Sequence, residues 1–225
     1  MYQKSLYELC CKLSEQYARE LTAEEIRKYI HIYKLPAIMG AIWSFTGHFY
    51  KWPQTLLARD DLPESIRASL EENLQDELGC RGTAPHTKLF IETASSMGVT
   101  LNACQPSGNF MIQTLKNARE QSVSKAIGAF FANESQAKWG GFMKAFSDQP
   151  GINMEFFRIH TCETLHSQTL LHGFVEEDIP GLLSGVIEFS KSRAIFMNAI
   201  RSQMTDPINS MAERDNQAFS GQFNY

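Results

Sequence analysis

Apolar residues recur at intervals of three and four along most of the chain, which is the spacing of helices that bury one face. No run of alternating apolar and polar residues is long enough to predict a strand. No repeat of 20 to 50 residues is visible, which disfavours a solenoid. We therefore expect an all-α protein, folded as a compact bundle of seven or eight helices.

Capping residues, prolines and glycines set the expected helix ends. Thr22 and Glu25 have the spacing of a capping box, and Gly79 and Gly98 stand where left-handed C-caps are common. The segment after Pro36 is nearly apolar, so we expect a central helix that stops before Pro53. The expected helices cover approximately residues 2–19, 22–35, 36–52, 63–79, 86–98, 109–147 (as one or two helices, with a kink or close-packing point at Gly140 and Gly141), 153–172 and 180–204.

The composition supports one domain. The chain has 225 residues, of which 43% are hydrophobic and 11% aromatic, enough for a substantial core. We expect a single helical domain over residues 1–205 and a polar tail over residues 206–225. The first twenty residues mix charges into their apolar positions, unlike a signal peptide or a membrane span. We therefore expect a cytoplasmic protein that does not bind membranes.

Charge and cysteine content narrow the function classes further. The net charge is -4 and the 21 Lys and Arg residues form no run, so we expect no nucleic-acid partner. The odd number of cysteines, five, and the absence of C-x-x-C spacing argue against a disulfide framework and a structural zinc site. The cysteines are Cys10, Cys11, Cys80, Cys104 and Cys162, and we expect reduced thiols.

Two histidines and a glutamate stand at three-residue intervals in FFRIHTCETLHSQ. On a helix, His160, Glu163 and His166 lie about 60° apart and share one face. The rise from His160 to His166 is about 9 Å, too long for one ion but suitable for two ions about 3.5–4 Å apart with Glu163 between them. The zinc-protease spacing is absent. The same spacing also suits three unrelated polar residues on one face of a helix, and spacing alone leaves both interpretations open.

Glu163-x-x-His166 matches one Glu-x-x-His unit of di-iron carboxylate sites in helical bundles, but the sequence has no second unit. Further ligands would have to come from upstream. Glu77, His86 and Glu134 are polar residues in otherwise apolar surroundings, and each is also compatible with a solvated helix surface.

Three segments in order resemble the haem-oxygenase-like proteins of the TenA, PqqC and Chlamydia death-domain-associating group, particularly their di-iron branch. The segment ENLQDELG with PHTKLF resembles the first signature, AIGAFFANESQA the second, and EFFRIHTCETLH the third. Together they span residues 72–166. The third signature departs from the family pattern, because two residues instead of three separate His160 from the acid, and the acid is Glu instead of Asp. A π-bulge would restore the facing of His160.

The resemblance implies a haem-oxygenase-like bundle and a metal site that holds two Fe(II) ions, or one Mn and one Fe, with O2 as co-substrate. The six ligands that it implies are Glu77, His86, Glu134, His160, Glu163 and His166. Three carboxylates against two dications leave a positive charge, which favours a carboxylate-bearing substrate. We therefore expect an oxidase or oxygenase that oxidises or cleaves a small molecule such as an amino acid or a fatty acid.

Two other classes of function stay open. One is a metal-free enzyme of the same fold, either a cofactorless oxidase resembling PqqC or a thiaminase-type hydrolase resembling TenA. The hydrolase would need a cysteine nucleophile, for which Cys104 and Cys162 are the candidates. The other class is a non-catalytic helical interaction module. The resemblance also allows a homodimer, since members of this fold often pair. We expect Phe90, Phe130, Phe131, Phe156 and Phe157 to pack in the core.

Overall fold

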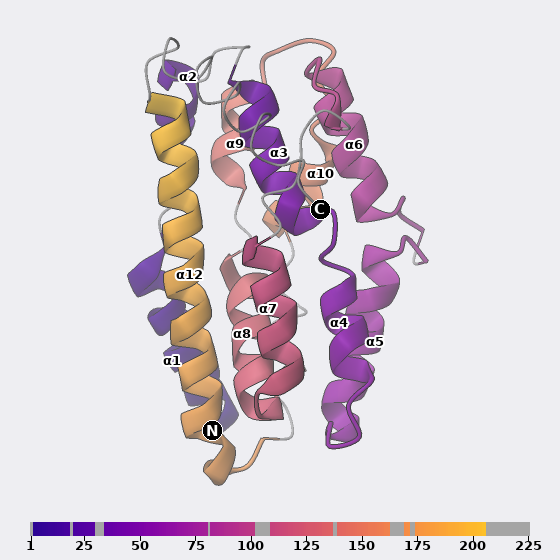
Figure 1. Ribbon diagram of the computed structural model, residues 1–225, viewed down its shortest axis with the longest axis vertical. Helices are drawn as coiled ribbons and strands as arrows, with labels where there is room; N and C mark the ends of the chain where they lie inside the picture. Colours follow the sequence, from indigo (N-terminus) through magenta and orange to yellow (C-terminus); the bar gives the residue numbers. More distant parts are fainter. Residues whose placement is uncertain are drawn as a thin grey trace, which may run out of the picture.

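Helices follow one another along the described residues of the computed structural model (Figure 1), and these residues contain no strand. The described residues are 2–18, 20–29, 34–80, 82–101, 109–136, 139–162, 169–171 and 174–205. The all-α fold expected from the helical periodicity is therefore confirmed. The helices in chain order are α1 (Tyr2–Tyr17), α2 (Ala23–Tyr29), α3 (Leu35–Thr46), α4 (Lys51–Leu57), α5 (Glu64–Glu77), α6 (His86–Ser96), α7 (Asn109–Glu120), α8 (Val123–Gln136), α9 (Gly140–Phe146), α10 (Glu155–Cys162), the 3₁₀ helix η2 (Glu176–Asp178) and α12 (Ile179–Thr205).

Several expected helix ends are confirmed by backbone geometry. The capping box before α2 forms, because the Glu25 amide donates to Thr22 Oγ1 at 3.1 Å and the Thr22 amide donates to Glu25 Oε2 at 2.8 Å. Gly79 and Gly98, which follow α5 and α6, both have a φ of 75°. This left-handed conformation is the one that favours glycine at the end of a helix.

The expected helix over residues 36–52 is divided in two. α3 ends at Thr46, a turn over residues 47–50 follows, and α4 begins at Lys51. Pro53, which we expected to end the helix, lies instead in the first turn of α4. Proline is tolerated there because the amides of the first turn have no partner within the helix.

The expected segment 109–147 contains three helices, α7, α8 and α9. Gly140 and Gly141 begin α9 instead of bending a longer helix. Of the two alternatives, close packing is confirmed at Gly141, where a Cβ atom would lie 1.8 Å from the Leu21 carbonyl oxygen. A side chain at this position would separate α9 from the segment that leads into α2.

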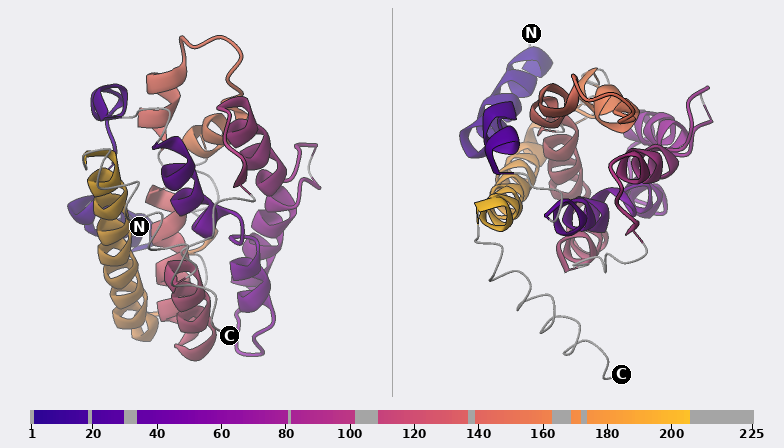
Figure 2. Two further views of the ribbon diagram at one scale, coloured as in Figure 1. Left: turned by 45° about the horizontal axis from the view of Figure 1, so that its top comes forward. Right: turned by 90° about the horizontal axis from the view of Figure 1, so that it is seen from above.

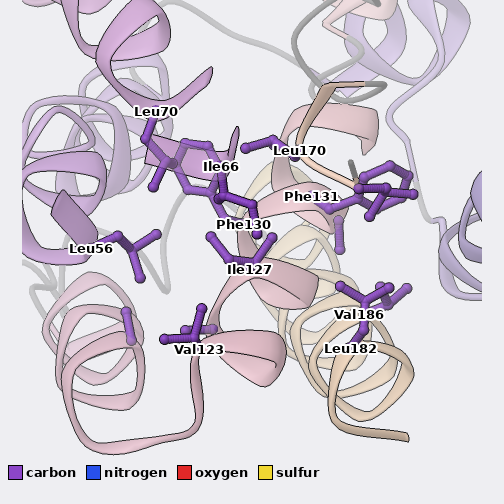
Figure 3. Packing of buried hydrophobic residues seen from close by; sticks show 14 of the residues in the cluster. Leu56, Ile66, Leu70, Val123, Ile127, Phe130, Phe131, Leu170, Leu182 and Val186 are labelled. Carbon is purple, nitrogen blue, oxygen red and sulfur yellow. The ribbon is translucent and has the colours of Figure 1, made fainter. Parts of the chain in front are cut away.

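The buried apolar side chains form two clusters, and the helices that supply most of them lie in the lower and the upper half of Figure 1 respectively. The first cluster draws mainly on α1, α4, α5, α8 and the first half of α12, and Figure 3 shows side chains from α4, α5, α8 and α12 meeting in it. The second cluster draws mainly on α2, α3, α6, α9, α10 and the second half of α12. The five phenylalanines expected in the core are all buried, Phe130 and Phe131 in the first cluster and Phe90, Phe156 and Phe157 in the second.

α12 connects the two clusters. It runs the length of the bundle beside α1, on the side opposite α5 and α6 (Figures 1 and 2). Its contact with α8 is close: a Cβ atom on Gly185 would lie 2.0 Å from the Lys125 carbonyl oxygen, and one on Gly128 would lie 2.0 Å from the Leu182 carbonyl oxygen. The two backbones therefore touch without intervening side chains, which fixes the position of α12 against α8.

Within the described residues, no helix has the length and apolar character needed to cross a membrane. The expected polar tail over residues 206–225 lies outside the described residues. The assignment of residues 1–205 to one domain stays a prediction.

Candidate metal centre

A layer of buried polar side chains separates the two apolar clusters. The earlier turns of α5 and α8 pack in the first cluster, and both helices end in polar residues. In α12, Arg193 lies between the residues that belong to the first cluster and those that belong to the second. The buried members of this layer are Asn73, Glu77, His86, Asn133, Glu134 and Arg193. Polar groups withdrawn from water need partners, so their gathering in one layer marks this region as a candidate site.

Glu77 and His86 are brought together by the turn between α5 and α6. Glu77 is the last residue of α5 and is 6% exposed, while His86 is the first residue of α6 and is 3% exposed. His86 Nδ1 lies 2.9 Å from Glu77 Oε1. Gly79 allows this approach, because its backbone has a φ of 75° and lies so close to Pro85 that a Cβ atom would be 2.5 Å from the Pro85 nitrogen.

His160 reaches the same point from α10. Its ring centroid is 4.7 Å from that of His86, and its Nδ1 lies 2.7 Å from the Phe156 carbonyl oxygen. Because a carbonyl oxygen only accepts, Nδ1 carries the proton and Nε2 keeps a lone pair. Burial of the ring and the nearby His86 imidazole lower the pKa of His160 to about 4, against the smaller opposing effects of Glu77 and the Phe156 carbonyl. His160 is therefore neutral near pH 7, the form that can bind a metal.

One ligand atom from each of Glu77, His86 and His160 lies within 4.8 Å of the other two. A carboxylate with two imidazoles suits Fe(II), Mn(II) and Zn(II), so the donor set fits a metal ion. Glu77 has two ways to serve such an ion: as a ligand, or as the acceptor that orients the His86 ring through Nδ1.

Glu134 faces the same cavity but is not part of this three-residue group. Its two carboxylate oxygens accept hydrogen bonds from the Asn73 and Asn133 side-chain amides, each at 3.3 Å. These amides hold the Glu134 carboxylate in place from α5 and α8. Glu134 is therefore a further carboxylate on the cavity wall, as the small and aromatic residues around it predict.

The cavity in the polar layer has a volume of about 30 Å³, room for a few atoms the size of water oxygens. Phe45 and Phe49 of the first cluster and Trp139 and Phe156 of the second enclose it, and Glu77, Glu134, His160 and Arg193 open onto it. Apolar walls around a few polar groups exclude bulk water and strengthen the electrostatic interactions inside.

Four of the six expected ligands therefore lie close together, with Glu77, His86 and Glu134 in the buried layer and the partly buried His160 beside them. Glu163 and His166 lie outside the described residues, as does Cys104. The second metal position expected from the spacing of His160, Glu163 and His166, and the expected π-bulge, stay predictions.

Arg193, which is not among the residues expected in the site, is 4% exposed and lines the cavity. A signal was present in the sequence. Val186, Phe189, Arg193, Met197 and Ile200 follow one another at helical spacing and are all buried, so the arginine occupies a position in an apolar stripe. An arginine in such a stripe either snorkels to the surface or has a buried role.

Comparisons with known proteins show the fold. No protein-family model matches the sequence, and the search of curated proteins finds no significant match. Among solved structures, a CADD-like protein of unknown function from Nostoc punctiforme is similar with a TM-score of 0.73 and 14% identity, over 91% of this chain and 96% of that one. A second structure of the Nostoc protein gives a TM-score of 0.74 with 15% identity, over 92% and 100% of the two chains.

A TenA homolog from Pseudomonas syringae is similar with a TM-score of 0.64 and 13% identity, over 88% of this chain and 91% of that one. Similarity of this extent at such low identity concerns the fold and does not transfer an activity. The chain shares the helical fold of the CADD-like and TenA proteins, and this confirms the haem-oxygenase-like bundle expected from the sequence.

Proposed function

We propose that the protein is a non-haem di-iron or iron–manganese oxidase or oxygenase, which uses O2 to oxidise or cleave a small carboxylate-bearing molecule. The observation that carries this proposal is the convergence of Glu77, His86 and His160 from three helices, with ligand atoms within 4.8 Å of one another in a buried layer. Imidazole and carboxylate donors leave a redox-active ion with open positions for O2.

The residues of this chain would hold the ions in a defined way. His160 is kept neutral and oriented by Phe156, and His86 is oriented by Glu77, so both rings can offer Nε2. Glu134, steadied by Asn73 and Asn133, supplies a second carboxylate to the same cavity. Glu163 and His166 complete the proposed ligand set on the sequence evidence alone.

The chemistry that the metal ions would supply is the reduction of O2 coupled to oxidation of the substrate. Reduction of O2 to two water molecules takes four electrons, so a two-electron oxidation of the substrate leaves two electrons for an external donor. The aromatic walls of the cavity limit the access of water, which protects reactive species from side reactions.

Metal analysis tests the proposal directly. The protein should be prepared with Fe(II) without oxygen, and the bound iron should be counted before and after His86→Ala and His160→Ala. We expect iron in the wild-type protein, an absorbance transient when O2 is added, and loss of both in each variant. His48→Ala is the matched control, because His48 neither belongs to the three-residue group nor lines the cavity.

Three outcomes would contradict the proposal. An iron-free wild-type protein that still oxidises a substrate with O2 would indicate a PqqC-like cofactorless oxidase. Thiamin hydrolysis that continues without metal and without O2 would indicate a TenA-like hydrolase. Absence of bound metal and of both activities would favour a non-catalytic interaction module.

A further inference from the structure

Arg193 is buried without well-formed hydrogen bonds for much of its guanidinium group. Its side chain is 5% exposed, and Nε and one terminal nitrogen (NH2) have no hydrogen-bond partner within the part of the chain that the structure describes. The nearest carboxylate is that of Glu20, where the terminal nitrogen and Oε1 are 3.5 Å apart, at the outer limit of a hydrogen bond.

This arrangement is costly unless a ligand completes it. A buried charged group needs hydrogen bonds to offset the loss of hydration, and burial lowers the pKa of the Arg193 guanidinium despite the opposing effect of Glu20. The guanidinium carbon lies 5.4 Å from the centre of the Trp139 ring, so one face of the fork is held by a cation–π contact. The fork is thus held in position, while among the described residues Nε has no hydrogen-bond partner and the terminal nitrogen has only the long ion pair with Glu20.

Arg193 lines the cavity together with three of the candidate metal ligands. Arg193, Glu77, Glu134 and His160 all line the same space of about 30 Å³. The cavity would admit a headgroup of a few atoms, and a planar headgroup with two acceptor oxygens matches the guanidinium fork.

We propose that Arg193 binds the carboxylate of the substrate, holding it in the cavity beside the metal centre. This inference rests on the proposed function and deepens it, because it assigns the carboxylate to one residue. Because Glu77 and His160 line the same small cavity, a carboxylate held by Arg193 would bring its neighbouring carbon atoms beside the metal centre. Oxidation is then directed to the carbon adjacent to the carboxylate or to the one after it.

A purely structural role for Arg193 makes a different prediction. If the arginine only joins α12 to Glu20, its replacement lowers stability and leaves ligand binding unchanged. Glu20→Gln removes the ion pair and leaves the guanidinium fork in place, so it is the matched control. Arg193→Lys keeps the charge but loses the planar pair of donors.

The test uses propionate as the probe and propionamide, which has a similar shape and no charge, as the reference. The full-length protein is titrated both without metal and after loading with redox-inert Zn(II), at constant ionic strength, and zinc content is measured in each sample. Binding is followed by tryptophan emission. The Trp139→Phe variant shows which part of the signal comes from Trp139, whose ring contacts the Arg193 guanidinium. Circular dichroism confirms that each variant is folded.

We expect propionate, and not propionamide, to change the emission of the wild-type and Glu20→Gln proteins. Arg193→Gln should weaken propionate binding by at least about tenfold, and the affinity of Arg193→Lys should lie between those of the wild type and Arg193→Gln. Equal binding by wild type and Arg193→Gln in both metal states, or no propionate binding in either, would overturn the inference. If Arg193→Gln does not fold, the wild-type and Trp139→Phe proteins still test the inference. Propionate, and not propionamide, should change the emission of the wild-type protein and leave that of Trp139→Phe unchanged. Absence of this difference would refute the inference.

Zinc content separates this result from the proposed function. Normal zinc content in Arg193→Gln together with weakened propionate binding supports both. Failure of every sample to hold metal counts against the metal centre, and Arg193-dependent propionate binding by the metal-free protein would then support the carboxylate site alone.

Discussion

His86 Nδ1 and Glu77 Oε1 lie 2.9 Å apart, although the two residues belong to different helices and both are buried. An ionised carboxylate can only accept, so it fixes the proton on Nδ1 of His86 and leaves the Nε2 lone pair for a ligand. The contact thus determines which ring nitrogen of His86 is available to a ligand.

Glu77→Gln should lower the affinity for Fe(II) at least about tenfold, because an amide neither ligates a metal well nor fixes the His86 proton in the same way. Affinity can be measured by competition with a chromogenic chelator under anaerobic conditions. Glu92→Gln is the control, since Glu92 lies on α6 with a 43% exposed side chain and pairs only loosely with Lys88 at 3.8 Å. Equal effects of the two changes would show that the Glu77 carboxylate has no special role.

Gly79→Ala should both destabilise the protein and weaken metal binding. The left-handed backbone costs a non-glycine residue about 1–3 kcal/mol, and the new Cβ would also clash with the segment that leads into His86. Gly82→Ala separates these effects, because Gly82 has a φ of 92° and no atom within 4 Å of the added Cβ. Urea unfolding of the metal-free protein should show a lower free energy of unfolding for both variants, with the larger decrease for Gly79→Ala. Only Gly79→Ala should also lose affinity for Fe(II).

Gly185→Ala should push α12 away from α8, because the added Cβ would lie 2.0 Å from the Lys125 carbonyl oxygen. Overpacking of this kind costs about 1–3 kcal/mol. α8 carries Glu134 and α12 carries Arg193, so the free energy of unfolding and propionate binding should fall together. Gly140→Ala, where the nearest atom to the added Cβ is 4.0 Å away, should leave both close to the wild-type values. Propionate affinity that survives the destabilisation would mean that this helix contact does not position Arg193.

Cys10 should resist alkylation in the folded protein. Burial, and secondarily the neighbouring Cys11, raise the pKa of the Cys10 thiol from 9.0 to about 12. A folded pKa above the unfolded value means that the thiol stays protonated at pH 9–10 in the folded state, and that stability is lost as the pH rises from 9 towards 12. Iodoacetamide labelling at pH 9, followed by mass spectrometry of peptides, should modify the exposed Cys80 and spare Cys10 until urea is added. Similar native rates at both cysteines would refute this.

Much of the helical layout follows from local chemistry. The Thr22–Glu25 capping box and the left-handed glycines at 79 and 98 are interactions within a few residues, so they are readable without a structure. The break after Thr46 was not predicted, because the following turn, residues 47–50, contains no proline and its aromatic residues continue the apolar character of the preceding helix. Tertiary packing decides such cases.

Part of the candidate site could likewise be predicted from the sequence, and part could not. Glu77, His86, Glu134 and His160 could be chosen from the sequence because each is a polar residue in apolar surroundings that also matches a resemblance. Arg193 was missed because it lies in a segment with other polar residues, SKSR, and its burial depends on Trp139, which is 54 positions away in the sequence. The apolar stripe of α12 marks position 193 as buried, but what the arginine meets there depends on helix packing.

The polar layer between the two apolar clusters also has a thermodynamic consequence. Each cluster is held together by its own apolar contacts, whereas the layer between them contributes charged and amide groups and a cavity. A ligand held by residues from α5, α6, α8, α10 and α12 would tie the upper half of the bundle to the lower half. Because α12 already runs through both clusters, ligand binding in the layer would strengthen the coupling between the two halves, so that unfolding becomes more cooperative with the ligand than without it.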